Sequence, residues 1–129
     1  MAQKYIVGDV VMYHNKIMVV KEPRDGSHFD LSCHKEGLVY CLVDIDEIKP
    51  ALLTPEILEK NGWRTQNRWY YYLDVAEGFI SYIGIDFKHK SNKGHLYVEV
   101  DGNNMVEIQY CHELQHFLFG LGINHEMEV

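Results

Sequence analysis

The sequence contains little proline and little cysteine, and no part of it is apolar enough to cross a membrane. Three prolines and a hydrophobic content of 47% exclude a disordered chain. The three cysteines, Cys33, Cys41 and Cys111, form no CxxC pair and have no regular spacing, which is typical of reduced thiols inside the cell. The first residues also lack the apolar core of a signal peptide. We therefore expect a soluble, cytoplasmic protein with no membrane partner.

An excess of positive charge is also missing. The formal net charge is −7, whereas proteins that bind the phosphate backbone of nucleic acids normally carry a basic face. No glycine-rich phosphate loop is present, because Gly120 and Gly122 end a helix where a phosphate site would begin one. Residues 88–93 are locally basic, but the overall charge favours another protein over a nucleic acid as the partner.

The first part of the chain, residues 1–52, alternates short β-rich runs with turn signals. A Gly8-Asp9 step opens the first strand, His14-Asn15 is a tight-turn candidate, and residues 44–47 resemble a single helical turn before a closing strand. This order resembles a small SH3-like β-barrel. Its aromatic residues predict a candidate recognition surface made of Tyr5, Tyr13, Phe29 and Tyr40, although such residues are more often half-buried strand positions.

The second part, residues 53–129, begins with a clear helix start. Thr54 suits the N-cap and Pro55 the first helical position, and Gly62 suits the end of the helix. Three strand-like runs and a final helix follow, which predicts an α-β-β-β-α unit with a three-stranded antiparallel sheet covered by the last helix. The fold class is therefore α+β. Because no flexible linker separates the two parts, we expect one compact unit.

The final helix carries the sequence His112-Glu113-Leu114-Gln115-His116, which matches the His-Glu-x-x-His pattern of zinc peptidases. In such a site the two histidines bind zinc and the glutamate acts as general base. A third protein ligand is needed, and His125 is the main candidate, with Glu126 or the upstream histidines His89 and His95 as further ones. The alternative function is thus a zinc-dependent hydrolase with Glu113 as its catalytic residue.

The periodicity of the same helix favours a simpler interpretation. Its apolar residues recur at spacings of three and four and form one stripe, and the two histidines lie on the opposite side. That placement predicts a polar histidine face toward solvent or a groove. Eight histidines in so short a chain also make an accidental match common enough to compete with a metal site. No complete catalytic set is present, which favours a protein that is not an enzyme and has no cofactor.

Three segments occur together in this chain: the barrel-like opening, residues 53–63, LTPEILEKNGW, and residues 110–116, YCHELQH. Together they resemble a family of small uncharacterised proteins from Bacteroidales gut bacteria and their phages. In that family the first helix commonly reads Leu-Thr-x-Glu-Ile-Leu-x-Lys-x-Gly before an aromatic residue, and the last helix carries His-x-Leu-Gln. The resemblance implies no activity or cofactor, and it implies that the positions of Glu113 and His116 vary. His112, Leu114 and Gln115 would then serve packing or docking.

Taken together, these patterns predict a non-enzymatic binding or interaction module, related to phages or mobile elements, whose partner is another protein. The zinc hydrolase remains the alternative.

Overall fold

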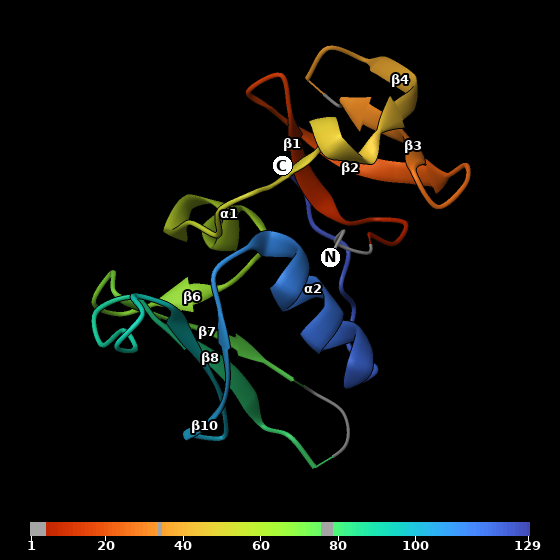
Figure 1. Cartoon of the computed structure of the whole chain (residues 1–129). Helices are drawn as coiled ribbons and strands as arrows, with labels where there is room; N and C mark the ends of the chain where they lie inside the picture. The colour runs from red at the N-terminus through yellow and green to blue at the C-terminus, as the bar shows by residue number, and fades with distance from the viewer. Residues whose placement is uncertain (1–4, 34, 76–78) are drawn as a thin grey trace. The chain divides into compact units, whose positions relative to one another are not determined.

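The computed structural model describes residues 5–33, 35–75 and 79–129, and it combines two antiparallel sheets with two α-helices (Figure 1). The chain divides into two compact units. The first unit holds the residues up to Leu52 together with 110–127 and 129, and the second unit holds 53–109 with Glu128. The predicted division differed, because it placed 110–127 with the second part. No helix in the described residues is long and apolar enough to cross a membrane.

The first unit contains an antiparallel sheet of five strands in the order β4-β3-β2-β1-β5. The strands are β1 (Val10–Tyr13), β2 (Lys16–Pro23), β3 (His28–Cys33), β4 (Leu38–Asp44) and β5 (Lys49–Pro50), with a 3₁₀ turn, η1 (Ile45–Glu47), before β5. The predicted tight turn at His14 and Asn15 is confirmed. Both residues have positive φ, 50° and 61°, as a two-residue turn between twisted strands requires.

The prediction of a closed barrel is wrong for the described residues. β4 and β5 lie at opposite edges of the sheet and do not pair with each other. The reason is the length of β5, which has two residues and pairs only with Val11 and Met12 of β1. A strand of two residues offers at most a minimal ladder to a second neighbour, and none forms with β4, so the sheet stays open.

One face of the first sheet carries an apolar core. Tyr5, Val11, Met18, Val20, Phe29, Leu31, Cys33, Val43 and Ile48 are all buried in it. Helix α2 (Cys111–Gly120) belongs to the same unit. The Glu113 carboxylate accepts the backbone N–H of Tyr110 at 2.9 Å and so caps the start of α2. Gly122, with φ 74°, follows its last turn.

The second unit contains α1 (Pro55–Lys60) and a second antiparallel sheet in the order β10-β9-β8-β7-β6. Its strands are β6 (Arg64–Thr65), β7 (Tyr70–Asp74), β8 (Tyr82–Asp86), β9 (Leu96–Val100) and β10 (Asn103–Ile108). The prediction of three strands is wrong, because β6 adds a short edge strand and the turn at Asp101-Gly102 folds β10 back on β9. The sequence Glu77-Gly78 predicts a further turn, and these two residues lie outside the described ones.

The start of α1 agrees with its prediction. Thr54 is the N-cap and its side chain accepts the N–H of Ile57, with Pro55 in the first turn. Tyr71 of β7 donates its hydroxyl to Glu59 of α1 at 2.9 Å, which ties the helix to the second sheet.

Candidate functional site

The histidine-bearing helix α2 is held to the start of β1 by the side-chain amide of Gln115. This side chain is fully buried. Its Oε1 accepts the N–H of Val10 at 2.8 Å, and its Nε2 donates to the carbonyl of Gly8 at 2.7 Å. Nε2 also donates to the carbonyl of His125 at 3.0 Å. One amide therefore pairs with the backbone of β1 as a neighbouring strand would, and also ties down the segment after α2.

Next to this amide, His116 meets a buried carboxylate. His116 Nε2 lies 2.8 Å from Asp9 Oδ2, and the same oxygen accepts the N–H of Ile6 at 2.9 Å. The Asp9 side chain is fully buried, whereas that of His116 is 36% exposed. Among the described residues, Asp9 Oδ1 has no hydrogen-bond partner. The pair orients the imidazole of His116 and keeps its Nε2 engaged with Asp9.

His112 is buried, with 6% of its surface exposed, so the prediction that it faces solvent or a groove is wrong. Its ring lies 5.4 Å from that of Tyr5 and is stacked at 6.0 Å on that of Tyr110. Burial lowers the pKa of His112 below its ordinary value. The physical reason is that the polar face of α2 packs on the segment before β1. Helical periodicity reveals an apolar stripe but not a polar face that docks.

This geometry does not assemble the zinc site of the alternative hypothesis. The Glu113 carboxylate caps the helix and His116 Nε2 is bound to Asp9. The ring of His125 packs against Phe119 at 4.9 Å, and its carbonyl is the group that meets Gln115. Among the described residues no group of three His, Cys, Asp or Glu side chains is placed to hold a metal ion. The described residues therefore do not fit a zinc ion.

Sequence reasoning missed Asp9, because the Gly-Asp step was interpreted only as the start of a strand. A weak indication of its role is present in the sequence. An acidic residue just before an apolar strand must either face solvent or find a donor, and here the donors are His116 and the N–H of Ile6.

The four aromatic residues of the predicted recognition surface are not all available for binding. Tyr5 and Phe29 are 6% and 4% exposed and lie in the core, their rings in edge contact at 6.0 Å. Tyr13 and Tyr40 are half-buried, pack against that core and contact each other at 5.6 Å. The prediction is therefore wrong for Tyr5 and Phe29, which the apolar face of the first sheet requires as packing residues.

The most unusual surface of the first unit is the edge strand β4. Leu38, Val39 and Leu42 are 47%, 45% and 61% exposed, and β4 pairs only with β3 in the described sheet. No charged residue occurs from Leu38 to Val43. Edge strands usually carry charges or proline that prevent pairing with other chains, and this strand carries neither before Asp44.

A β-bulge shapes the same edge. Phe29 pairs with Val43 and Leu31 with Tyr40, so that Cys41 and Leu42 together oppose Asp30. Leu42 has φ 54°, a left-handed conformation that is strained for a bulky residue.

The carboxylate of Asp30, which is 3% exposed, stabilises this strained conformation of Leu42. Its Oδ1 accepts the N–H of Leu42 at 3.0 Å, and its Oδ2 accepts from Arg24 Nε at 2.8 Å. The Arg24 guanidinium and the Leu42 amide hold the pKa of Asp30 below its usual value. The bulge directs the Leu42 side chain outward, and a charged hydrogen-bond network maintains it.

Comparisons of the chain with protein-family models, with curated proteins and with solved structures find no match. The resemblance to the Bacteroidales and phage family therefore stays a prediction.

Proposed function

We propose that the chain is a non-enzymatic binding module that takes up an extended segment of another protein along β4. The observation that supports this proposal is the open edge of the first sheet, where an uncharged strand exposes Leu38, Val39 and Leu42. An edge strand offers unpaired backbone groups that give affinity, and its exposed side chains give specificity. The partner segment would become a sixth strand beside β4.

The charges at the two ends of β4 indicate the chemistry of that segment. Lys35 lies exposed before the strand, and Asp44 and the exposed Asp46 lie at its other end. Antiparallel pairing is the pattern of every neighbouring pair in this sheet. An antiparallel partner would therefore have a basic residue near its N-terminal end, apolar β-branched residues in its middle and an acidic residue near its C-terminal end.

Three finer predictions belong to the same proposal. The strand order resembles that of SH3-like folds, which commonly serve as binding modules. A cytoplasmic location is supported by the free thiols, two of which are buried. The link to phages or other mobile elements rests on the family resemblance alone.

The test is a binding titration with a fluorescent synthetic peptide that has a basic residue, alternating valine and threonine, and an acidic residue in that order. The matched control peptide exchanges the basic and the acidic residue. We expect the first peptide to bind more tightly and to shift the backbone NMR signals of residues 38–44. Equal binding of both peptides, or shifts elsewhere only, would refute the proposed mode.

Variants of two edge strands sharpen the test. Replacing Val39 and Leu42 by lysine places charge on β4 and should weaken binding by about tenfold or more. The matched control places lysine at Met105 and Val106 of β10, another edge strand whose apolar residues are 60% and 37% exposed. This control should leave binding unchanged. A stable dimer of the chain that the peptide does not dissociate would also refute the proposal, because a second copy would then occupy β4.

A further inference from the structure

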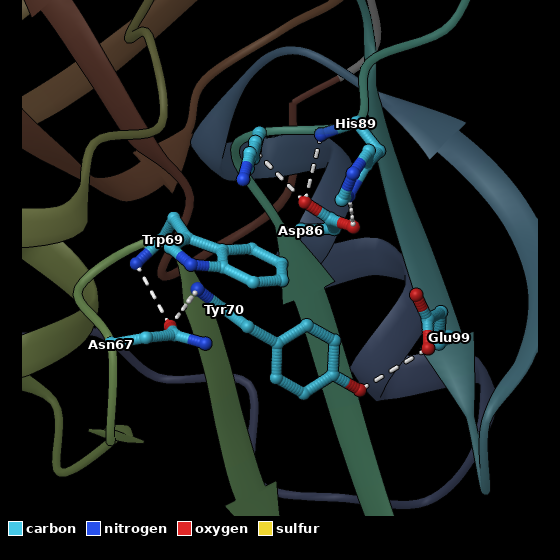
Figure 2. A network of polar contacts seen from close by, with 7 residues as sticks. Asn67, Trp69, Tyr70, Asp86, His89 and Glu99 are labelled. Carbon is cyan, nitrogen blue, oxygen red and sulfur yellow. Dashed lines mark hydrogen bonds and ion pairs between the residues drawn. The ribbon is translucent and has the colours of Figure 1, made fainter.

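One end of the second sheet presents a tryptophan beside cationic side chains. Trp69 is half-buried, whereas Trp63, the other tryptophan of the chain, is 5% exposed. The Lys88 ammonium lies 5.3 Å from the centre of the Trp69 ring. The ring of His89 meets the same indole edge-on at 5.4 Å (Figure 2). The indole therefore lies within a cluster of exposed Lys88 and His89.

Two anchored turns hold this cluster in place. The Asp86 carboxylate, 7% exposed, accepts the N–H groups of Lys88 and His89 at 2.8 and 2.9 Å and contacts His89 Nδ1 at 2.9 Å (Figure 2). On the other turn, Asn67 Oδ1 accepts the N–H groups of Trp69 and Tyr70 (Figure 2). The N–H of Phe87 donates to the carbonyl of Trp69 at 2.8 Å and joins the two turns. The backbone of the two turns that carry Trp69, Lys88 and His89 is thus fixed before any ligand arrives.

The charge around Trp69 differs in sign from that of the whole chain. From Phe87 to Val98 the sequence contains three lysines and two histidines but no acidic residue. Ser91 and Gly94 close this segment into a tight loop, in which the Gly94 N–H donates to the Ser91 carbonyl at 2.9 Å. Lys90 and Lys93 of the loop are exposed. Asp86, the nearest acidic residue in sequence, is paired with His89, and within the described residues no ion pair engages the ammonium groups of Lys88, Lys90 or Lys93.

We propose that this surface, made of Trp69, Lys88, His89 and Lys90 with Lys93, binds single-stranded nucleic acid. A half-exposed indole can stack on a base, and flanking lysines can contact the phosphates on either side of it. In this arrangement Lys88 moves from the indole to a phosphate, and its place over the ring is taken by the base. A single strand fits better than a duplex because only unpaired bases offer their faces for stacking.

The net charge of −7 lowers the affinity without preventing local binding. Interactions between exposed charges are largely screened beyond about 8 Å at physiological ionic strength, so the nearest lysines dominate. Affinity should therefore fall as salt rises, with a slope of about 0.7 for each phosphate contacted in a single strand. This site belongs to the second unit and β4 to the first, and either proposal can fail without the other.

The test is fluorescence anisotropy of labelled oligothymidylate and oligouridylate against the full chain at several salt concentrations. Duplex DNA and vesicles of anionic lipid are the competing probes. Quenching of the intrinsic tryptophan emission is followed in parallel, because base stacking on Trp69 should reduce it.

Three variants separate the residues of the surface. Trp69→Ala should weaken binding by about 5- to 150-fold, and Trp69→Phe, which keeps an aromatic face, should retain part of it. Lys88→Gln should weaken binding and reduce the salt slope by about 0.7. The matched control is Lys60→Gln, which removes the same charge from the end of α1 in the same unit. Far-UV circular dichroism of each variant checks its fold.

Binding of single strands with the expected loss in Trp69→Ala and Lys88→Gln, and none in Lys60→Gln, would support the proposal. It would be overturned by no binding at low salt, by an equal loss in Lys60→Gln, or by equal binding of duplex or vesicles. Unchanged tryptophan emission on binding would also overturn it, since a base would then not stack on Trp69.

Discussion

The amide of Gln115 should be the most sensitive polar group of the first unit. Replacing it by methionine keeps the length of the side chain and removes all of its hydrogen bonds. The N–H of Val10 and the carbonyls of Gly8 and His125 would lose the partner that now meets them at 2.7 to 3.0 Å. The contact of α2 with the start of β1 would then lose these three hydrogen bonds.

The size of the effect follows from these contacts. Leaving the buried N–H of Val10 without its partner costs about 1–3 kcal/mol, and losing each of the two part-buried bonds to carbonyls costs about 1 kcal/mol, so the variant Gln115→Met should lose about 3–5 kcal/mol of unfolding free energy. Domains of this size are stable by only about 5–15 kcal/mol. The variant should thus be close to unfolding in its first unit. The exposed Gln66→Met is the matched control and should change stability by less than about 0.5 kcal/mol.

The assay must distinguish the two units. Both tryptophans lie in the second unit, so their fluorescence follows that unit, whereas the amide of Val10 reports on the first. Hydrogen exchange at Val10 should accelerate strongly in Gln115→Met, and urea unfolding followed by circular dichroism should begin at lower concentration. A loss below about 1 kcal/mol, with unchanged exchange at Val10, would show that Gln115 does not hold α2 to β1.

Replacing Gln115 by glutamate tests which of its hydrogen bonds need a donor. Its carboxylate could still accept from Val10, but it would face the carbonyls of Gly8 and His125 and could not donate to them. Burial would raise its pKa above the ordinary value of about 4.3. The folded state would then bind the proton more tightly than the unfolded chain. The variant Gln115→Glu should therefore lose stability as pH rises above that value, and wild type should not show this loss.

Three further predictions concern other buried groups. Burial lowers the pKa of His112, so the unfolded chain takes up the proton first, and stability should fall as pH drops below about 6.5. In His112→Phe the unfolding free energy should depend less on pH in this range, which urea titrations at several pH values would measure. An unchanged pH dependence would refute the role of His112. Gly84→Ala should cost about 1–3 kcal/mol, because an added Cβ would overlap the Tyr70 ring, whereas Gly26→Ala meets open space, and thermal unfolding compares the two. A thiol reagent should label Cys41 alone in the native protein and all three cysteines in denaturant. The reason is that Cys33 and Cys111 are buried and that burial raises the pKa of Cys111 to about 12. Fast labelling of Cys111 in the native protein would contradict the described packing.

Local features of the fold could be predicted where neighbouring residues determine them. The N-cap at Thr54 and the tight turn at His14 and Asn15 each depend on a few adjacent side chains, and both are confirmed. One of the two strands that the prediction missed in the second sheet, β6, could not be predicted, because it is two residues long and exists only through its pairing with Tyr71 and Tyr72. A strand of that length has no periodicity of its own.

The candidate site shows a different limit. The contacts of Gln115 and His116 with Gly8, Val10 and Asp9 span more than 100 positions of the chain. Spacing along the sequence cannot reveal such contacts. The pattern of His112, Glu113 and His116 therefore suggested zinc chemistry as an alternative function, and the partners of these residues do not support it: Glu113 caps the helix and His116 pairs with Asp9.

The exposed edge of β4 depends on tertiary contacts and cannot be predicted from the sequence of the strand alone. Residues 38–43 are uncharged and alternate poorly, which by itself suits a buried strand. The strand is at an edge because β5 is too short to close the sheet, and Leu42 is turned outward because Asp30 and Arg24 stabilise a strained bulge. If the Arg24→Gln variant weakened the Asp30 network, the bulge should relax and the exposed apolar row should change shape. Peptide binding along β4 should then fall even though Arg24 lies outside that strand.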